Sequence, residues 1–207
     1  MSGTLFECGY GAIVLEDVAV LEACLFALLD QFIPGLDHVI RVLEIGMHDG
    51  GTARGIENYL KPVSDRIGRN LLRYTGIDPE NGSTRPRHIP AGGKVIIGDS
   101  AEVFSQVEGP LDLVWVDGCH CMNHVILDVA HYATMIRVGG FILFHDANPT
   151  AQGQTHQYHG PDIPEFAVSV TKGLEAIQFP WPNWKLFDKR FPSDKQDCGT
   201  LAFQRIA

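Results

Sequence analysis

The sequence has no long uninterrupted run of apolar residues, although 45% of its side chains are hydrophobic. A helix that crosses a membrane needs about 20 mostly apolar residues in succession. The beginning of the sequence also lacks the pattern of a secretory signal, which is a basic region followed by an apolar core and a small-residue cleavage site. We therefore expect a cytoplasmic protein with no membrane partner.

Positive charge is scarce. Lys and Arg total 16 against 25 Asp and Glu, which gives a formal net charge of −9. No stretch concentrates basic side chains enough to neutralise a row of phosphates. Nucleic acid is therefore not an expected partner.

Cysteine is also infrequent and odd in number, with Cys8, Cys24, Cys119, Cys121 and Cys198 spread along 207 residues. A chain of this size can bury a full hydrophobic core without disulfide staples. We expect reduced thiols and a single domain over residues 1–207.

The sequence does contain a repeated alternation of apolar runs and amphipathic segments. Apolar residues recur at three- and four-residue steps over 14–32, within an N-terminal extension of residues 1–35, and indicate a helix that covers a sheet edge or a second subunit of a homo-oligomer. Further strands and helices alternate along the chain, which is typical of an α/β protein with helices on both faces of a parallel sheet. The predicted strands are 39–45, 72–77, 94–97, 111–116 and 140–144, and the predicted helices between them are 52–60, 101–107 and 122–136.

The end of the chain departs from this alternation. Residues 184–187 and 200–206 have no helical pattern between them, so we expect an antiparallel hairpin that completes a Rossmann-like, mainly parallel sheet of seven strands. Two polar segments, 79–93 and 147–164, look like loops over a binding site, and 147–183 as a whole is expected to be a substrate loop or lid.

Acids and glycines follow the first predicted strand. In an open parallel sheet a ligand binds beyond the carboxyl ends of the strands, where helix N-termini offer free N–H groups. Here Glu44 and Gly46 are followed by Gly50 and Thr52. This loop suits the methionine part of S-adenosylmethionine, because its ammonium matches an acid and its carboxylate matches helix-start N–H groups and Thr52. A strand-to-helix turn without a ligand would also use glycines.

The next two strands end on polar residues as well. Asp78 can accept hydrogen bonds from both hydroxyls of a ribose, or can instead be a turn residue before Pro79. Asp99 and Ser100 can face the adenine edge of the cofactor, or can cap the following helix, and these two roles are compatible.

A nicotinamide-dependent dehydrogenase would use the same kind of sheet. Its Gly-x-Gly-x-x-Gly fingerprint is not matched, because Gly46 is followed by Met47 and His48, and the acid expected about 20 residues later comes only at Asp78. An NAD-dependent oxidoreductase and a non-catalytic cofactor-binding module remain as alternatives, and S-adenosylmethionine is the favoured cofactor.

The fourth and fifth strands lead into Asp117-Gly118-Cys119-His120 and, after Gly139-Gly140, into His145-Asp146. Together with the Glu44 and Gly50 segments, these stretches resemble the class I S-adenosylmethionine-dependent methyltransferases, in particular the metal-dependent O-methyltransferases of the macrocin and catechol type. The resemblance covers residues 38–148 and implies methyl transfer to a hydroxyl of a small-molecule acceptor.

The same resemblance implies that Asp117 and Asp146 hold Mg²⁺, with Asp117 also bordering the cofactor and acting in catalysis, and that His120 is the general base. Mg²⁺ favours carboxylates, water and substrate oxygens, and it makes a bound hydroxyl easier to deprotonate. Relatives often carry a second acid beside Asp146. Here that position is His145, so His145 or Asn148 completes a metal site, or His120 and His145 act without metal. A helix cap at Asp117 and a surface turn at His120 are the structural alternatives.

Two other patterns carry less information. The spacing Cys119-His120-Cys121 is too short for an ordinary structural zinc site, and His156 and His159 form an isolated pair, so zinc is not expected. Four aromatic residues are candidates for an apolar pocket wall, although Trp184 suits the core of the hairpin better; the four are Tyr158, Phe179, Trp181 and Trp184.

Overall fold

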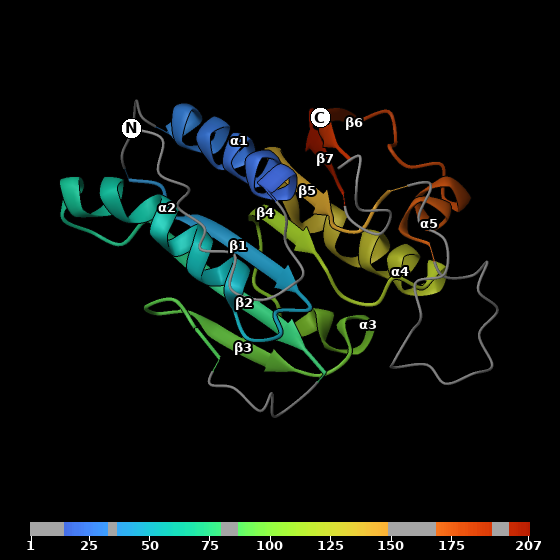
Figure 1. The fold of residues 1–207 in the computed structure, drawn as a ribbon, viewed down its shortest axis with the longest axis horizontal. Helices are drawn as coiled ribbons and strands as arrows, with labels where there is room; N and C mark the ends of the chain where they lie inside the picture. Colours follow the sequence, from blue (N-terminus) through green and yellow to red (C-terminus); the bar gives the residue numbers. More distant parts are fainter. Residues whose placement is uncertain (1–14, 33–36, 80–86, 149–168, 192–198) are drawn as a thin grey trace.

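The computed structural model describes residues 15–32, 37–79, 87–148, 169–191 and 199–207 (Figure 1). Its strands are β1 (Ile40–Ile45), β2 (Leu72–Asp78), β3 (Lys94–Ile97), β4 (Leu111–Val116), β5 (Ile136–Phe144), β6 (Trp184–Arg190) and β7 (Thr200–Arg205). Its α-helices are α1 (Leu15–Phe32), α2 (Gly51–Ile67), α3 (Ser100–Val103), α4 (Met122–Tyr132) and α5 (Val170–Ala176). None of the helices in these described parts is long and apolar enough to cross a membrane.

The seven strands form one sheet in the order β3-β2-β1-β4-β5-β7-β6. The first five strands along the chain pair in parallel, whereas β7 is antiparallel to both β5 and β6. The chain direction across the sheet reverses between β1 and β4, which is where an open α/β sheet opens a crevice for a ligand. The predicted seven-stranded, mainly parallel sheet with a terminal antiparallel hairpin is confirmed.

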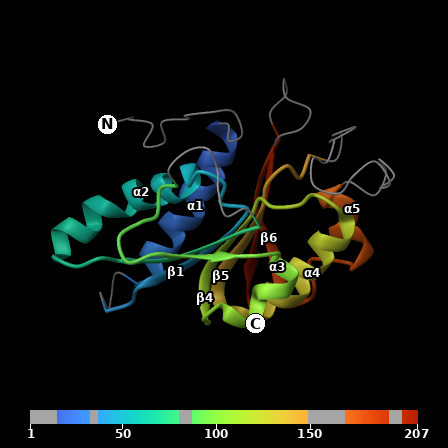
Figure 2. The same cartoon turned by 90° about the horizontal axis from the view of Figure 1, so that it is seen from below.

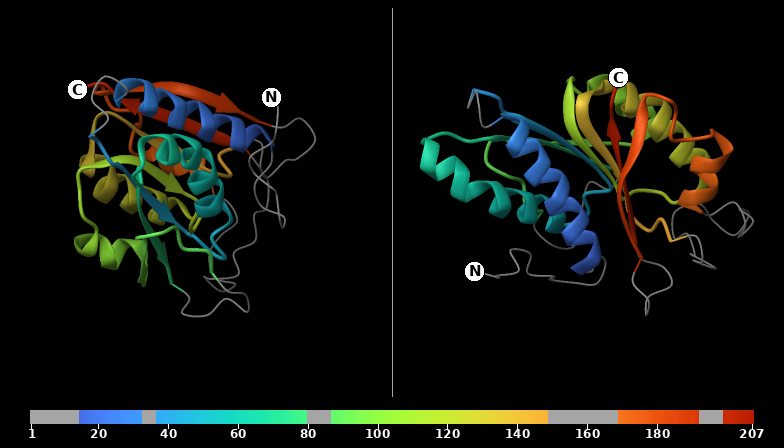
Figure 3. Two further views of the ribbon diagram at one scale, coloured as in Figure 1. Left: turned by 90° about the vertical axis from the view of Figure 1, so that its left-hand side faces the viewer. Right: turned by 90° about the horizontal axis from the view of Figure 1, so that it is seen from above.

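Helices cover both faces of the sheet. In Figures 2 and 3, α1 and α2 lie on one side and α3, α4 and α5 on the other. The first face is packed with Leu21 and Leu28 of α1 and Ile56 of α2. On the second face, Val125 of α4 and Leu174 of α5 join the buried side chains of β4 and β5. Because α1 packs against β5, β6 and β7, it covers the sheet as predicted; a role in a homo-oligomer stays a prediction.

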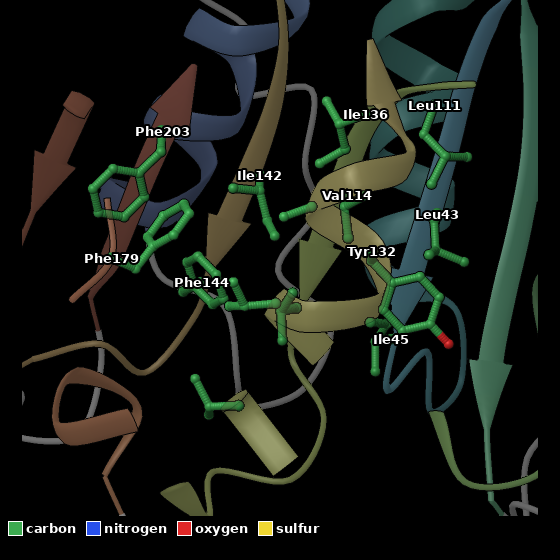
Figure 4. Packing of buried hydrophobic residues seen from close by; sticks show 14 of the residues in the cluster. Leu43, Ile45, Leu111, Val114, Tyr132, Ile136, Ile142, Phe144, Phe179 and Phe203 are labelled. Atoms are coloured by element: carbon green, nitrogen blue, oxygen red, sulfur yellow. The ribbon is translucent and has the colours of Figure 1, made fainter. Parts of the chain in front are cut away.

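An aromatic cluster closes the core beside the hairpin. Figure 4 shows Phe179 and Phe203 next to Phe144 of β5, and the rings of Phe179 and Phe203 have centroids 4.9 Å apart. Phe179 and Trp184 are buried in this core, and Trp181 packs against it. The suggestion that Phe179 lines a substrate pocket is therefore wrong, because its ring fills the space between α5 and β7. Tyr158, His156 and His159 lie outside the described residues.

Several element boundaries differ from the predicted ones. Helix α2 runs to Ile67 with Pro62 inside it, and α3 ends at Val103 before a short 3₁₀ turn. Strand β5 starts at Ile136 rather than at 140, because the strand continues through Gly139-Gly140 with a shift in register against β4. Helix α5 occupies part of the segment expected to be a loop or lid, 147–183, which is a correction for residues 170–176. Residues 149–168 of that segment, and 80–86 of the other predicted loop, lie outside the described residues.

Candidate active site

Main-chain hydrogen bonds draw the ends of the central strands together. Asp117 N–H donates to Ile45 O over 2.9 Å, and Gly46 N–H donates to Ile77 O over 2.8 Å. Gly46 has φ +84°, and a Cβ at this position would lie 2.2 Å from the main-chain oxygen of Asp117. Only glycine permits this contact and this backbone conformation. The loops after β1 and β4 therefore meet at one edge of the sheet.

Glu44 lies in β1 with only 1% of its surface exposed. Tyr74 Oη donates a hydrogen bond of 2.5 Å to its carboxylate, and Thr52 donates another. Burial raises the pKa of Glu44 to about 8, although these two hydrogen bonds act in the opposite direction. Glu44 is therefore a buried acid whose charged form needs a cation, and Thr52 contacts it as the first turn of α2 begins.

Asp78 ends β2 and fixes the loop that follows β1. One of its carboxylate oxygens accepts a hydrogen bond of 2.8 Å from the main-chain N–H of His48, and the other accepts one of 2.9 Å from Arg87. Gly50, with φ +79°, lies in the same loop, and a Cβ there would come within 2.2 Å of the main-chain oxygen of His88. The structure thus gives Asp78 a role in holding this loop, and the ribose contact assigned to it stays a prediction.

Asp99 and Ser100 lie where β3 passes into α3. Asp99 is the N-cap of α3, because its Oδ1 accepts from the N–H of Ala101 over 2.9 Å; the predicted capping role is thus confirmed. Ser100 is buried and its hydroxyl donates to Asp128 over 2.6 Å. The adenine contacts assigned to Asp99 and Ser100 stay predictions, and for Ser100 the hydroxyl proton is already used by Asp128.

Beyond β4 and β5, the side chains of Asp117, His120 and Asp146 meet. One donor atom from each lies within 4.8 Å of the other two. His120 Nε2 is 3.3 Å from Asp146 Oδ2, and the three side chains are 17–21% exposed. Asp146 takes a left-handed backbone conformation with φ +51°, which is uncommon outside glycine and tends to be kept at functional sites. The structure therefore brings together the three residues to which the sequence assigned metal binding and base catalysis.

His145 lies directly beneath this group and is 1% exposed. Its Nδ1 is 2.9 Å from Asp117 Oδ1, and its Nε2 is 3.0 Å from Asp17 Oδ2 on α1. Burial opposes a charge on this ring, but the neighbouring carboxylates, Asp117 foremost, hold the pKa of His145 well above its usual range. Thr200 also donates to Asp17 over 2.8 Å. Because both ring nitrogens of the buried His145 face carboxylates, the geometry favours His145 as a support for Asp117, whereas His120, whose side chain is 21% exposed, is the imidazole that solvent reaches.

Sequence reasoning missed three residues of this region. Asp17 is fully buried on the face of α1 that also carries Leu21 and Leu28, and an acid within an apolar stripe was the available signal. Tyr74 was read only as part of a buried strand. Arg87 had no signal, since it lies in a polar segment that also contains Arg85 two residues earlier. Asn148, the other candidate for completing a metal site, is buried with 8% exposed.

The chain matches a family model described as a methyltransferase domain over residues 43–147, which is just over half of its length. The chain belongs to this family of methyltransferase domains. The matched segment begins in β1 and ends just after Asp146, so it contains the strand-end residues described above. The family match favours the methyltransferase over the NAD-dependent oxidoreductase, and the predicted class I resemblance is confirmed.

A curated relative is phthiotriol/phenolphthiotriol dimycocerosates methyltransferase 1 of Mycobacterium ulcerans (strain Agy99), which is 27% identical over 113 residues. The match takes in 53% of this chain but only 38% of the relative, so the chain spans well under two thirds of that protein's length.

Solved structures share the fold. Cofactor-bound Rv0187 from MTB has 17% identity and a TM-score of 0.65, with 97% of this chain and 85% of that chain covered. The MycE methyltransferase of the mycinamycin biosynthetic pathway, in complex with Mg, SAH and mycinamycin VI, has 20% identity and a TM-score of 0.53, with 96% and 56% covered. At these identities the likeness establishes the methyltransferase fold.

Proposed function

We propose that this protein transfers the methyl group of S-adenosylmethionine to a hydroxyl oxygen of a small molecule, with Asp117 and Asp146 holding Mg²⁺ and His120 acting as the general base. The observation that carries the proposal is the meeting of Asp117, His120 and Asp146 within 4.8 Å at the carboxyl edge of the sheet. In a methyltransferase-domain chain, this edge also carries the loop suited to the cofactor.

The residues around Glu44 fit the cofactor. Glu44 is an acid whose charge burial disfavours, and the ammonium of the methionine part supplies the missing cation. Gly46 and Gly50 have no side chains, so the main chain of the loop is open to close approach by the cofactor. The 17-residue helix α2 offers the N–H groups of its first turn to the methionine carboxylate. The remaining assignments are the ribose hydroxyls to Asp78 and the adenine amino group to Asp99.

The donor set beside Asp117 also fits a hard divalent cation. Mg²⁺ is usually bound by one or two carboxylates together with water and substrate oxygens, which Asp117 and Asp146 match. The complex of MycE with Mg and SAH supports this choice of ion. When bound, the ion lowers the pKa of the acceptor hydroxyl.

The side chains of this chain then handle the proton. His120 accepts the proton of the acceptor hydroxyl as its oxygen attacks the methyl group, and the Asp146 carboxylate, 3.3 Å from Nε2, stabilises the imidazolium that forms. His145, held between Asp17 and Asp117, keeps the Asp117 carboxylate in place. His145 is therefore a positioning residue in this scheme rather than a third ligand.

Calorimetry with S-adenosylhomocysteine tests the cofactor, and no binding at millimolar concentration would refute the proposal. Transfer of labelled methyl from S-adenosylmethionine to a panel of hydroxylated aromatic and sugar-containing compounds tests the reaction. We expect EDTA to abolish turnover and added Mg²⁺ to restore it, whereas a mechanism with histidines alone would survive EDTA.

Two variants separate the roles at the site. His120→Ala is expected to lower kcat by 10²–10⁴-fold, the usual contribution of a general base, while leaving cofactor affinity within about twofold. Asp146→Ala is expected to raise the Mg²⁺ concentration needed for turnover. His131→Gln, in the last turn of α4 where the ring stacks on Phe104, is the matched histidine control. A non-catalytic cofactor-binding module would bind the cofactor and respond to neither substitution.

A further inference from the structure

A second group of donor atoms lies in the same turn between β4 and α4. The sulfur atoms of Cys119 and Cys121 and a ring nitrogen of His124 all lie within 4.8 Å of one another. Cys121 is buried, while the other two side chains are partly buried. The main-chain N–H of Cys121 donates to Cys119 Sγ over 3.4 Å, so the turn is wound tightly around the two sulfurs. This group shares no residue with Asp117, His120 and Asp146.

The spacing Cys119-His120-Cys121 is too short for these three consecutive residues to bind one zinc ion together. The structure separates the set: His120 joins Asp146, whereas His124, in the first turn of α4, joins the two cysteines. The ligand spacing is thus Cys-x-Cys-x-x-His, in which a turn supplies two sulfurs and a helix supplies the imidazole. A helix start places His124 over the turn that precedes it, because side chains on a helix lean toward its N-terminus.

Acidic groups surround this cluster. His124 Nε2 is 3.2 Å from Asp99 Oδ2, and a carboxylate beside a metal-binding histidine is the usual partner that orients its ring. Asp128, one turn further along α4, is 1% exposed, and its charge acts on the Cys119 thiol. Oδ2 of Asp128 has no hydrogen-bond partner among the described residues. A buried carboxylate oxygen without a partner is costly, and a nearby cation would offset that cost.

We propose that Cys119, Cys121 and His124 bind one zinc ion, with water in the fourth position. Two sulfurs and one imidazole are ligands that zinc favours and that Mg²⁺ does not. On binding, each thiol releases its proton to solvent, two S–Zn bonds and one N–Zn bond form, and no electron is transferred. The hard site at Asp117 and the soft site at Cys119 therefore select different metals within one turn.

A zinc ion here ties together the parts that carry the proposed chemistry. It joins the turn that holds Asp117 and His120 to the start of α4, and through His124 and Asp99 to the start of α3. The proposal assigns no catalytic step to the ion and does not depend on methyl transfer.

Cobalt titration of the metal-free protein tests this site without any variant. We expect a thiolate-to-cobalt charge-transfer band in the near ultraviolet that reaches its full height with one bound Co²⁺ per chain. The strong visible bands of tetrahedral cobalt should accompany it, and both should disappear when Zn²⁺ is added. Carboxylate and imidazole ligands alone give no thiolate band. Absence of that band in the reduced wild-type protein would overturn the proposal.

Variants assign the ligands. Cys119→Ser and Cys121→Ser should each weaken Co²⁺ binding at least 100-fold, and His124→Cys should keep binding while raising the thiolate band by about half, as three sulfurs replace two. His131→Gln on the same helix and Asp146→Asn in the other group should leave the band unchanged. A band that persists in both serine variants would also refute the assignment.

The outcomes separate this inference from the proposed function. Methyl transfer by a protein that shows no thiolate–cobalt band overturns the zinc site alone. An intact band in a protein that fails to bind S-adenosylhomocysteine overturns the proposed function alone. Because EDTA removes Zn²⁺ as well as Mg²⁺, the turnover recovered with Mg²⁺ alone must be compared with the turnover recovered with Mg²⁺ and Zn²⁺ together.

Discussion

Asp17→Asn is the substitution for which the structure gives the clearest expectation. Asp17 is a fully buried side chain of α1, and its two carboxylate oxygens accept from His145 over 3.0 Å and from Thr200 over 2.8 Å. The neighbouring carboxylates, Asp117 foremost, hold the pKa of His145 well above its usual range despite its burial, which favours the protonated ring. Asparagine keeps the shape of the side chain and removes its charge.

Removal of one partner from a buried ion pair costs about 3–5 kcal/mol, because the other charge stays buried. We expect a loss of about 3 kcal/mol in the free energy of unfolding, since Asp117 still compensates part of the charge on His145. With a urea m-value of about 2–3 kcal/mol/M, the unfolding midpoint should fall by about 1–1.5 M. Glu16→Gln changes the adjacent, exposed acid of the same helix and should stay within about 0.5 kcal/mol of wild type.

The pH dependence gives this prediction a sign. A histidine whose folded pKa is raised contributes stability that is complete below its unfolded pKa of about 6.5 and is lost as the pH rises through the raised value. The stability gap between wild type and Asp17→Asn should therefore be widest near pH 6–7 and should narrow in alkaline buffer. A midpoint shift below about 0.3 M at pH 7, or a gap that widens as the pH rises above 7, would refute the reasoning.

Two further predictions concern the loop after β1. Burial raises the pKa of Glu44 from 4.5 to about 8, so the wild-type free energy of unfolding falls as the pH rises through this window. In urea unfolding, the free energy of unfolding of Glu44→Gln relative to wild type should therefore rise toward pH 8, by at most about 5 kcal/mol. A difference between the two proteins that does not change with pH would contradict this prediction. Gly46→Ala combines a left-handed backbone with a Cβ 2.2 Å from a main-chain oxygen, and thermal unfolding should show a loss of more than about 2 kcal/mol together with weaker binding of S-adenosylhomocysteine. Gly68→Ala, with φ +70° and nothing within 4 Å, should cost only about 1–2 kcal/mol and leave that binding unchanged.

Much of the sheet edge was predictable from local sequence. Runs of β-branched and other apolar residues stop at Gly46, Asp78 and Asp117, and parallel strands necessarily bring such ends to one side. Because Asp78 and Asp117 come directly at the ends of these runs, the same argument places both acids at that edge. The family resemblance added the assignment of Asp146 and His120 to chemistry, and the structure brings these two side chains together.

Contacts between distant segments were not predictable from spacing. Both His145 and His120 lie beside these acids, and how each approaches them depends on the backbone turn at Asp146, where φ is +51°. The neighbouring loop residues give no periodic signal for this turn. The partnership of His145 with Asp17 spans 128 positions and depends on how α1 crosses the sheet. Helix α5 was missed because it is only seven residues long and follows a polar segment.

The bond from Thr200 to Asp17 joins the last strand of the sheet to its first covering helix across 183 positions. A contact between such distant parts of a chain stabilises the protein only after the loop between them has closed and its conformational entropy has been lost. During synthesis, Asp17, which holds His145 against Asp117, therefore lacks the hydrogen bond from Thr200 until β7 has emerged and paired with β5. A chain stalled before residue 200 would thus hold every residue assigned to the reaction and yet lack the hydroxyl that donates to Asp17.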